Sequence, residues 1–135
     1  MSSDIRFGRH VVFNLHAHLV FVTKYRRKVL NQKILDDMKN IFQKIATESQ
    51  VILKEFNGEE DHVHLLIHYP PKVSLAKLVN SLKGVSSRRL RQNWPDLEKS
   101  YYQGVLWSPS YFAGSWGGAP LEIVRRYIEA QQTPA

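Results

Sequence analysis

The sequence predicts an α+β fold, a ferredoxin-like antiparallel sheet with two helices packed on one face and a further helix at the C-terminus. In some segments apolar residues recur at every second position, as strands require, and in others they recur at helical spacing. The two kinds of segment alternate along the chain. Their order is strand, helix, strand, strand, helix, strand, helix, and the first six elements match the split βαβ–βαβ pattern. The 135 residues contain no repeat and no low-complexity stretch, so we expect a single domain over residues 1–135.

The first half of the chain supplies two strands and the first helix. Residues 1–10 are polar and are expected to be loose, whereas residues 14–22 alternate as a strand does. A basic loop with one aromatic residue follows at 23–28, Asn31 is placed to cap a helix, and residues 51–56 form the second strand. The apolar residues of the helix recur at helical spacing: Ile34, Leu35, Met38, Ile41, Phe42 and Ile45.

The third strand, residues 61–68, is followed by the second helix, whose inward residues are Leu75, Leu78, Val79 and Leu82. Turn, breaker and capping residues delimit these elements: a hairpin turn at Asn57-Gly58, a stop at Pro70-Pro71, a cap at Ser74, an interruption at Gly84 and an end at Trp94-Pro95.

The last strand and the last helix close the chain. Residues 105–112 are apolar and aromatic but contain Pro109, which predicts an edge strand or a bulged one. Residues 114–118 form a glycine-containing flexible loop. Pro120 suits the first position of a final helix, which we expect over residues 119–132.

In the ferredoxin-like topology the first and third strands are neighbours, and this gathers the histidines of the chain. Because side chains alternate along a strand, those at even positions share the open face, opposite the packing helices. They are His16, His18, His62, His64 and His68.

Composition limits the chemistry. With 19 Lys and Arg against 12 acidic residues, the net charge of +7 favours a polyanionic partner. The sequence has no cysteine, which excludes disulfides and thiolate sites, so a metal would need His, carboxylate or amide ligands. No leader opens the chain and no apolar run reaches the ~18 residues that span a bilayer, so we expect no membrane partner and a cytoplasmic location.

Two motifs predict one active site. In the third strand, His62 and His64 point to the same face. In the last helix, Tyr127 and Gln131 are four residues apart and share a face. One divalent metal held by two imidazoles and an amide oxygen, beside a tyrosine hydroxyl, is equipped to attack a phosphodiester. The hard cations Mg²⁺ and Mn²⁺ suit such ligands, and no glycine-rich loop for a nucleotide cofactor is present.

The helical wheel of the last helix places the tyrosine within its buried arc. One apolar stripe is Leu121, Val124 and Ile128, and a second beside it is Ile123, Tyr127 and Gln131. A buried Gln131 requires hydrogen-bond or metal partners. The alternative is that the helix frays near the C-terminus and leaves Gln131 hydrated. For the histidines, the alternative is that they form the polar face of a half-buried sheet.

The chain resembles a known family, the single-tyrosine, single-strand transposases of bacterial and archaeal insertion sequences in the His-hydrophobe-His (HUH) superfamily. The resemblance runs from His18 to Gln131 and rests on five segments in order. They are 18–27 (HLVFVTKYRR), 61–65 (DHVHL), 78–88 (LVNSLKGVSSR), 106–112 (LWSPSYF) and 127–131 (YIEAQ).

This resemblance implies a function and roles for residues. His62, His64 and Gln131 would be the metal ligands, and Tyr127 would be the nucleophile that forms a 5′-phosphotyrosine and frees a 3′-hydroxyl. The family has an RRM-like fold, acts as a homodimer, recognises subterminal DNA hairpins on single strands, and in some members completes each active site with the partner's tyrosine helix.

The basic side chains of the loop and of the second helix are the candidate DNA contacts, with one aromatic side chain for base stacking. They are Lys24, Tyr25, Arg26, Arg27, Lys83, Arg88, Arg89 and Arg91. A solvated basic face is the alternative for each of them.

Other functions fit parts of the sequence. A non-catalytic RRM-like nucleic-acid-binding module explains the charge but leaves the spacing of Tyr127 and Gln131 unexplained, and the aromatic-rich ribonucleoprotein motif is absent. A metal-dependent hydrolase would use the five histidines. A replication or conjugation nickase is disfavoured by the short length. A domesticated HUH nuclease that processes chromosomal repeats uses the same chemistry, and only genomic context separates it from a mobile element.

Overall fold

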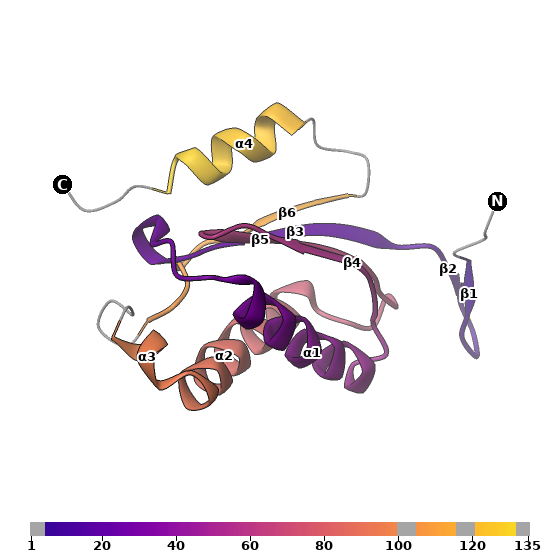
Figure 1. Ribbon diagram of the computed structural model, residues 1–135. Coiled ribbons are helices and arrows are strands. Elements are labelled where there is room, and N and C mark those ends of the chain that lie inside the picture. Colours follow the sequence, from indigo (N-terminus) through magenta and orange to yellow (C-terminus); the bar gives the residue numbers. More distant parts are fainter. Residues whose placement is uncertain (1–4, 100–104, 116–120, 132–135) are drawn as a thin grey trace.

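A four-stranded antiparallel sheet lies between two helices on one face and a single helix on the other (Figure 1). The computed structural model describes residues 5–99, 105–115 and 121–131. In chain order the elements are β1 (Arg6–Phe7), β2 (Val12–Phe13), β3 (His16–Val22), a single 3-10 turn η1 (Lys24–Arg26), α1 (Gln32–Glu48), β4 (Ile52–Gly58), β5 (His62–His68), α2 (Leu75–Asn93), α3 (Pro95–Glu98), β6 (Phe112–Ser115) and α4 (Leu121–Glu129). The sheet order β4-β5-β3-β6 confirms the predicted ferredoxin-like fold and makes β3 and β5 neighbours. None of the described helices is both long enough and apolar enough to span a membrane.

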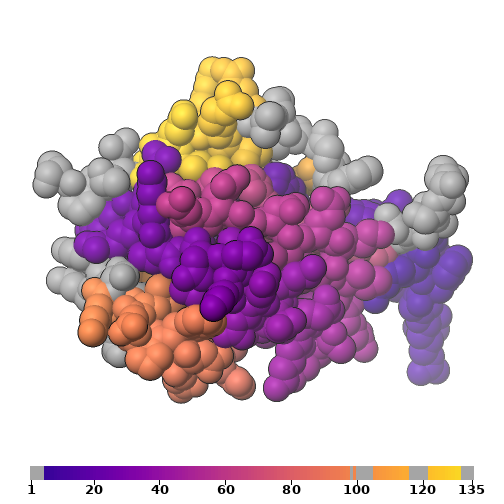
Figure 2. Space-filling view, in the orientation of Figure 1, coloured from indigo at the N-terminus to yellow at the C-terminus, as the bar shows by residue number. Residues whose placement is uncertain are grey.

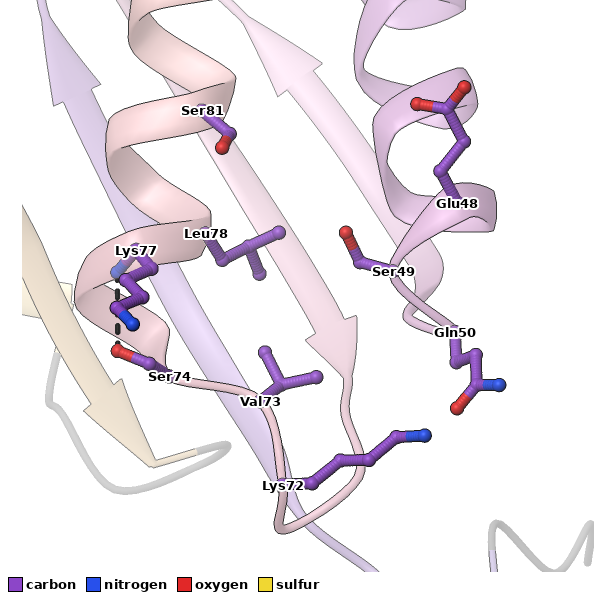
Figure 3. A pocket seen from close by; sticks show the side chains of 9 residues that line it. All are labelled: Glu48, Ser49, Gln50, Lys72, Val73, Ser74, Lys77, Leu78 and Ser81. Carbon is purple, nitrogen blue, oxygen red and sulfur yellow. Dashed lines mark hydrogen bonds between the residues drawn. The ribbon is translucent and has the colours of Figure 1, made fainter.

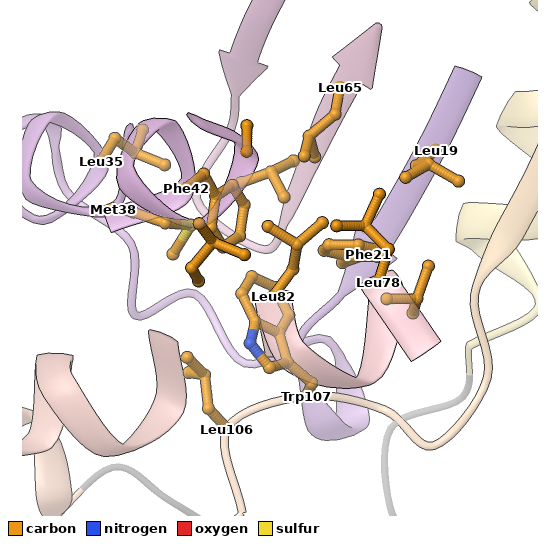
Figure 4. Packing of buried hydrophobic residues seen from close by; sticks show 14 of the residues in the cluster. Leu19, Phe21, Leu35, Met38, Phe42, Leu65, Leu78, Leu82, Leu106 and Trp107 are labelled. Atoms are coloured by element: carbon orange, nitrogen blue, oxygen red, sulfur yellow. The ribbon is translucent and has the colours of Figure 1, made fainter. Parts of the chain in front are cut away.

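The main core fills the space between the sheet and helices α1 and α2 (Figure 4). Phe21 from β3 contacts Phe42 from α1 edge to face, with 6.0 Å between ring centroids. Trp107 closes the same cluster, and its ring lies 5.8 Å from that of Phe21. The predicted caps are confirmed: Asn31 accepts from the backbone N–H of Ile34, and Ser74 from that of Lys77.

Helix α2 continues through Gly84, so the predicted interruption is wrong. A Cβ at Gly84 would meet no atom within 4 Å, which means that the glycine lies on an open side of the helix. Glycine lowers helix propensity by about 1 kcal/mol but leaves the backbone hydrogen bonds intact.

The N-terminal segment is more ordered than expected. Instead of a loose stretch, Arg6 pairs with Phe13 and Phe7 with Val12 in a two-stranded hairpin. The Arg6 guanidinium donates to the carbonyls of Gln50 (3.0 Å) and His68 (3.4 Å), which ties the hairpin to the sheet.

The turn between β4 and β5 lies later than predicted. Asn57 and Gly58 are still paired in the sheet, opposite His64 and Val63. A Cβ on Gly58 would lie 2.5 Å from Leu35 Cδ2. This glycine therefore allows α1 to approach the strand closely, and it does not form the turn.

The last strand also begins later than predicted, at Phe112 and not at residue 105. Phe112 pairs with Val20, and Trp107 forms an isolated bridge with Thr23. The four residues between Trp107 and Phe112 thus face only the two residues of β3 between Val20 and Thr23. Pro109 lies within this bulge, as the sequence predicted. We call residues 108–110 the serine arch.

Helix α4 covers the other face of the sheet. Val124 and Ile128 pack on Val20 and Val22 of β3 and form a second, small core. Ile123 is 48% exposed, so the second buried stripe predicted for this helix is wrong at that position. The helix contacts mainly two valines of one strand, and such a narrow contact buries a single stripe.

Candidate active site

The five predicted histidines share the sheet face that carries α4. His16 pairs with His68, and their rings lie 4.5 Å apart. His62 and His64 are half-buried, with 5.0 Å between their ring centroids. His68 is fully buried and stacks on Phe13 of the N-terminal hairpin. The shared face is confirmed, and His62 and His64 lie at the start of β5, next to the basic loop.

Asp61 fixes the orientation of His62. The His62 Nδ1–H donates to Asp61 Oδ1 at 2.8 Å, so Nε2 is the remaining nitrogen. Asp61 is itself held on its other oxygen, Oδ2, by Arg26 Nε at 3.3 Å. A carboxylate that accepts from a ligating imidazole selects the tautomer and raises ligand basicity.

The basic loop delivers Arg26 to this position. Thr23 is buried, and its Oγ1 lies within hydrogen-bonding distance of the carbonyl oxygens of Arg27 (2.8 Å) and Asp61 (3.1 Å), between which its single O–H is shared; these contacts fold the loop back on itself. Tyr25 and Arg26 adopt positive φ values of 59° and 55°. Backbone of this kind is unfavourable for side chains other than glycine, asparagine and aspartate, and it persists where surrounding contacts impose it.

His18 contacts the Nδ1 nitrogen of His64, as Asp61 contacts that of His62. His18 Nε2 and His64 Nδ1 are 3.1 Å apart, and the rings are stacked at 5.3 Å. Burial, with His62 and His18 nearby, lowers the pKa of His64 to about 4, and burial also lowers the pKa of His18 against the opposing effect of Glu55. Both imidazoles are therefore neutral at neutral pH. If the His64 Nδ1–H donates to His18, the lone pair on His64 Nε2 is available for a ligand.

We predict that Asp61→Asn weakens Mn²⁺ binding roughly tenfold to a hundredfold, the range found when a partner that orients a metal ligand is changed. The amide N–H₂ can donate to His62 Nδ1 and so favour the wrong tautomer. Mn²⁺ titration followed by electron paramagnetic resonance measures the effect, with Asp36→Asn on the exposed side of α1 as the control. Equal affinity in both variants would show that Asp61 does not orient a ligand.

The serine arch holds Tyr127 of α4 and Gln131, which lies two residues beyond the end of that helix at Glu129. Ser110 Oγ lies 2.8 Å from the Tyr127 hydroxyl, and Ser108 Oγ donates to Gln131 Oε1 at 2.6 Å. Gln131 Nε2 donates to the carbonyl of Tyr127 at 3.3 Å, so both ends of the amide are bonded. Gln131 is therefore not simply hydrated, which answers the alternative raised by its place near the C-terminus. Burial raises the pKa of Tyr127, partly opposed by the bond to Ser110, and the phenol is protonated at neutral pH.

Tyr127 and the histidine pair lie on the same face of the sheet, but on opposite sides of strand β3. The ring of Tyr127 lies 6.0 Å from that of Phe112 in β6, whereas His62 and His64 belong to β5 on the opposite side of β3. Ser108 marks the same end of the sheet as His62, because its N–H bonds the carbonyl of Val22 and Val22 pairs with His62. In this state the described partner of the Tyr127 hydroxyl is Ser110, on the β6 side of β3.

The residues present fit a divalent metal. In the described part of the chain, no three His, Cys, Asp or Glu side chains come together to hold an ion, so carboxylates and imidazoles alone do not complete a site. Two oriented imidazoles leave room for an amide oxygen and water as further ligands.

The candidate DNA contacts separate into two groups. The loop residues lie beside Asp61 and the histidine pair, where Lys24 Nζ is 5.1 Å from the Tyr25 ring centroid. Arg88 and Arg89 are exposed on α2, behind the sheet. Sequence reasoning gave no role to Asp61, Ser108 or Ser110, although all three lie within the motifs it quoted.

Helix α4 stands out from the sheet face that carries the histidine pair. Figure 2 shows α4 as a raised ridge on the surface. A cavity of about 410 Å³ lies elsewhere, between the end of α1 and the start of α2, and its lining contains none of the predicted catalytic or metal residues (Figure 3).

The chain is thus an α+β protein whose ferredoxin-like sheet carries an oriented histidine pair on one face, under a helix with a half-buried tyrosine. Comparison with known proteins gives the family. The family model described as transposase IS200 like matches residues 11–131, and the chain belongs to this family of transposases.

Relatives and solved structures agree with this assignment. The chain is 33% identical over 128 residues to the ISDra2 transposase TnpA of Deinococcus radiodurans, with 95% of this chain and 91% of that protein covered. It is 30% identical over 122 residues to the transposase for insertion sequence element IS200 of Salmonella typhimurium, covering 90% and 80%. A crystal structure described as a transposase from D. radiodurans R1 superposes with a TM-score of 0.86 at 33% identity, covering 96% and 99% of the two chains. A REP-associated tyrosine transposase bound to a REP hairpin gives 0.57 at 11% identity, covering 96% and 69%, which shows the shared fold alone.

Proposed function

We propose that this transposase cleaves and rejoins single-stranded DNA at the ends of an insertion sequence through a metal-assisted 5′-phosphotyrosine intermediate. The observation that carries the proposal is the histidine pair on β5. Each imidazole has a bonded Nδ1 and a remaining Nε2, on the same sheet face as Tyr127. Such orientation of two adjacent imidazoles is typical of metal ligands.

The proposed chemistry assigns a role to each residue. The Tyr127 oxygen attacks the phosphorus, the bond between phosphorus and the 3′-oxygen breaks, and the departing 3′-oxygen takes up a proton as the phenol loses its own. His62, His64 and Gln131 would hold Mg²⁺ or Mn²⁺, which supplies stabilisation of the charge that develops on the phosphate oxygens. The phosphotyrosine conserves the bond energy, so a 3′-hydroxyl of another strand can displace Tyr127 and no nucleotide cofactor is needed.

Adduct formation tests this function. We expect single-stranded oligonucleotides copied from the DNA that flanks the gene, with their hairpins intact, to become covalently attached to the protein in Mg²⁺ or Mn²⁺, and the product to remain on a denaturing gel. EDTA should abolish the product. Binding of the same oligonucleotides without any adduct, in either metal, would instead support the non-catalytic binding module.

DNA hairpins are the proposed recognition elements, as for the REP-associated relative, whose structure contains a REP hairpin. The chain carries a net charge of +7, and the Lys24–Arg27 loop lies beside the histidine pair. We predict that log K for hairpin binding falls linearly with log salt concentration, with a slope of about −0.9 for each duplex phosphate neutralised. Fluorescence anisotropy at several salt concentrations measures the slope. A flat response would exclude the basic loop and α2 as phosphate contacts.

A homodimer in which each α4 completes the partner's site would resolve the separation of Tyr127 from the histidine pair. Mixing Tyr127→Phe and His64→Ala subunits distinguishes the arrangements. If the tyrosine acts in trans, the mixed dimer has one complete site and forms adduct. If it acts in cis, both subunits of the mixed dimer are inactive. Size-exclusion chromatography with light scattering supplies the oligomeric state.

A further inference from the structure

Lys83 makes contacts that a phosphate-binding lysine does not need. It lies on α2, on the far side of the sheet from α4, and its ammonium donates to the carbonyls of Ser108 (2.7 Å) and Ser110 (3.0 Å). The ring centroids of Phe21 and Tyr111 lie 5.9 and 6.0 Å from Nζ. Burial lowers the pKa of Lys83 to about 8. Two of its three N–H donors are thus committed to one short segment of backbone.

That segment, the serine arch, needs such a partner. The ladder between β3 and its edge neighbour is interrupted between the Val20–Phe112 pair and the Thr23–Trp107 bridge. Carbonyl groups within a bulge lose their ladder partners, and a buried carbonyl left unsatisfied costs ~1–3 kcal/mol. Ser108 is 7% exposed. One ammonium bonded to two carbonyls, two residues apart, sets the curvature of the arch.

A second contact fixes the start of the arch. The Trp107 indole donates to Ser86 Oγ at 3.0 Å, and Ser86 Oγ donates to the carbonyl of Lys83 at 3.1 Å. The same turn of α2 therefore holds the chain on both sides of Ser108.

The hydroxyls of the arch hold Tyr127 of α4 and Gln131, just beyond the end of that helix. Ser108 donates to Gln131 Oε1, Ser110 contacts both Gln131 Oε1 (3.4 Å) and the Tyr127 hydroxyl, and Gln131 Nε2 returns to the Tyr127 carbonyl. These bonds allow one orientation of the Gln131 amide, with the oxygen toward the arch. An amide oxygen has two lone pairs, so it can accept from Ser108 and still ligate a cation.

We propose that Lys83 is a positioning residue, which acts through the serine arch to orient the Tyr127 phenol and the Gln131 amide for strand cleavage. This inference rests on the proposed function and goes beyond it by adding Lys83, Ser108 and Ser110 to the machinery. A displacement of about 1 Å at a reacting group can reduce the rate by ~10²-fold. We therefore expect loss of Lys83 to slow cleavage ten- to a hundredfold while hairpin binding changes less than twofold.

The experiment compares Lys83→Met, which keeps the length of the side chain but cannot donate, with Lys77→Met, an exposed lysine on the same helix. Circular dichroism and hairpin affinity establish that each variant is folded. Single-turnover cleavage then gives the rate of the chemical step. Ser110→Ala and Ser108→Ala are the second pair of variants, since they interrupt the same path without touching the charge on α2.

A spectroscopic readout does not depend on activity. With fluorotyrosine at the six tyrosines, the ¹⁹F resonance that Tyr127→Phe removes reports the surroundings of the phenol. We expect this resonance to move toward the position of an exposed tyrosine in Lys83→Met and Ser110→Ala, and to stay unchanged in Lys77→Met.

Three results would overturn the proposal. If Lys83→Met weakens hairpin binding in parallel with cleavage and leaves the Tyr127 resonance in place, Lys83 is a phosphate contact. If cleavage becomes faster, the arch restrains a resting tyrosine and does not prepare a reacting one. If the wild-type protein forms no adduct, the proposed function fails, and an unchanged resonance in Lys83→Met would then reject the arch contact separately.

Discussion

Tyr127→Phe is expected to abolish the covalent protein–DNA adduct completely while the affinity for hairpin DNA stays within twofold of the wild-type value. The substitution removes one oxygen, the atom that would attack phosphorus, and keeps the ring that packs on Phe112. Cleavage and affinity are measured on the same oligonucleotide, by denaturing gel and by fluorescence anisotropy. The contact between Tyr127 and Ser110 is also lost, so thermal unfolding should be followed in parallel.

Tyr111→Phe is the matched control, because Tyr111 is another half-buried tyrosine at the same edge of the sheet. Its ring lies near Lys83, and its hydroxyl has no proposed chemical role. An adduct that persists in Tyr127→Phe and disappears in Tyr111→Phe would move the nucleophile to Tyr111.

His64→Ala is expected to reduce metal-dependent cleavage by roughly 10³-fold, since a catalytic cation contributes several kcal/mol of charge stabilisation and each 1.36 kcal/mol corresponds to a factor of ten. Mn²⁺ affinity should fall as well. Hairpin binding without metal should be retained, because the imidazole of His64 faces His18 and His62.

His16→Ala controls for the loss of an imidazole from the same sheet face. His16 pairs with His68 at the opposite end of the strands, away from the proposed ligands. If His64→Ala cleaves at the wild-type rate in Mg²⁺ and in Mn²⁺, the histidine pair does not bind the catalytic metal.

Features governed by local sequence could be predicted. The alternation of residues 62–68 placed His62 and His64 on one face, because the period of a strand is a local property. Asn31 and Ser74 cap helices through bonds to residues three positions later, which a sequence pattern contains. Pro109 indicated a bulge since it lacks the N–H that a ladder needs.

Features that depend on distant contacts could not be predicted. Gly58 in Asn57-Gly58 has the signature of a turn, yet the glycine is required by the approach of Leu35 from α1, and no pattern near Gly58 reveals that neighbour. The strands of the N-terminal hairpin have two residues each, too few for a period to be recognised.

The orienting residues of the site were missed for the same reason. His18 lies 46 residues from its partner His64, and Ser108 lies 23 residues from Gln131. A motif shows which residues recur near a reactive group, whereas only the fold shows which atoms they bond.

The described part of α4 has nine residues, and a peptide of that length is a poor helix in water, because nucleation is unfavourable and few hydrogen bonds follow it. Its helicity therefore depends on the contact of Val124 and Ile128 with Val20 and Val22, whether those valines belong to the same chain or to a second copy. Transfer of the tyrosine between subunits would pass through a state in which this segment is partly melted. Backbone amides of residues 124–129 should then exchange with deuterium faster than those of β3, and DNA that captures the helix should slow that exchange.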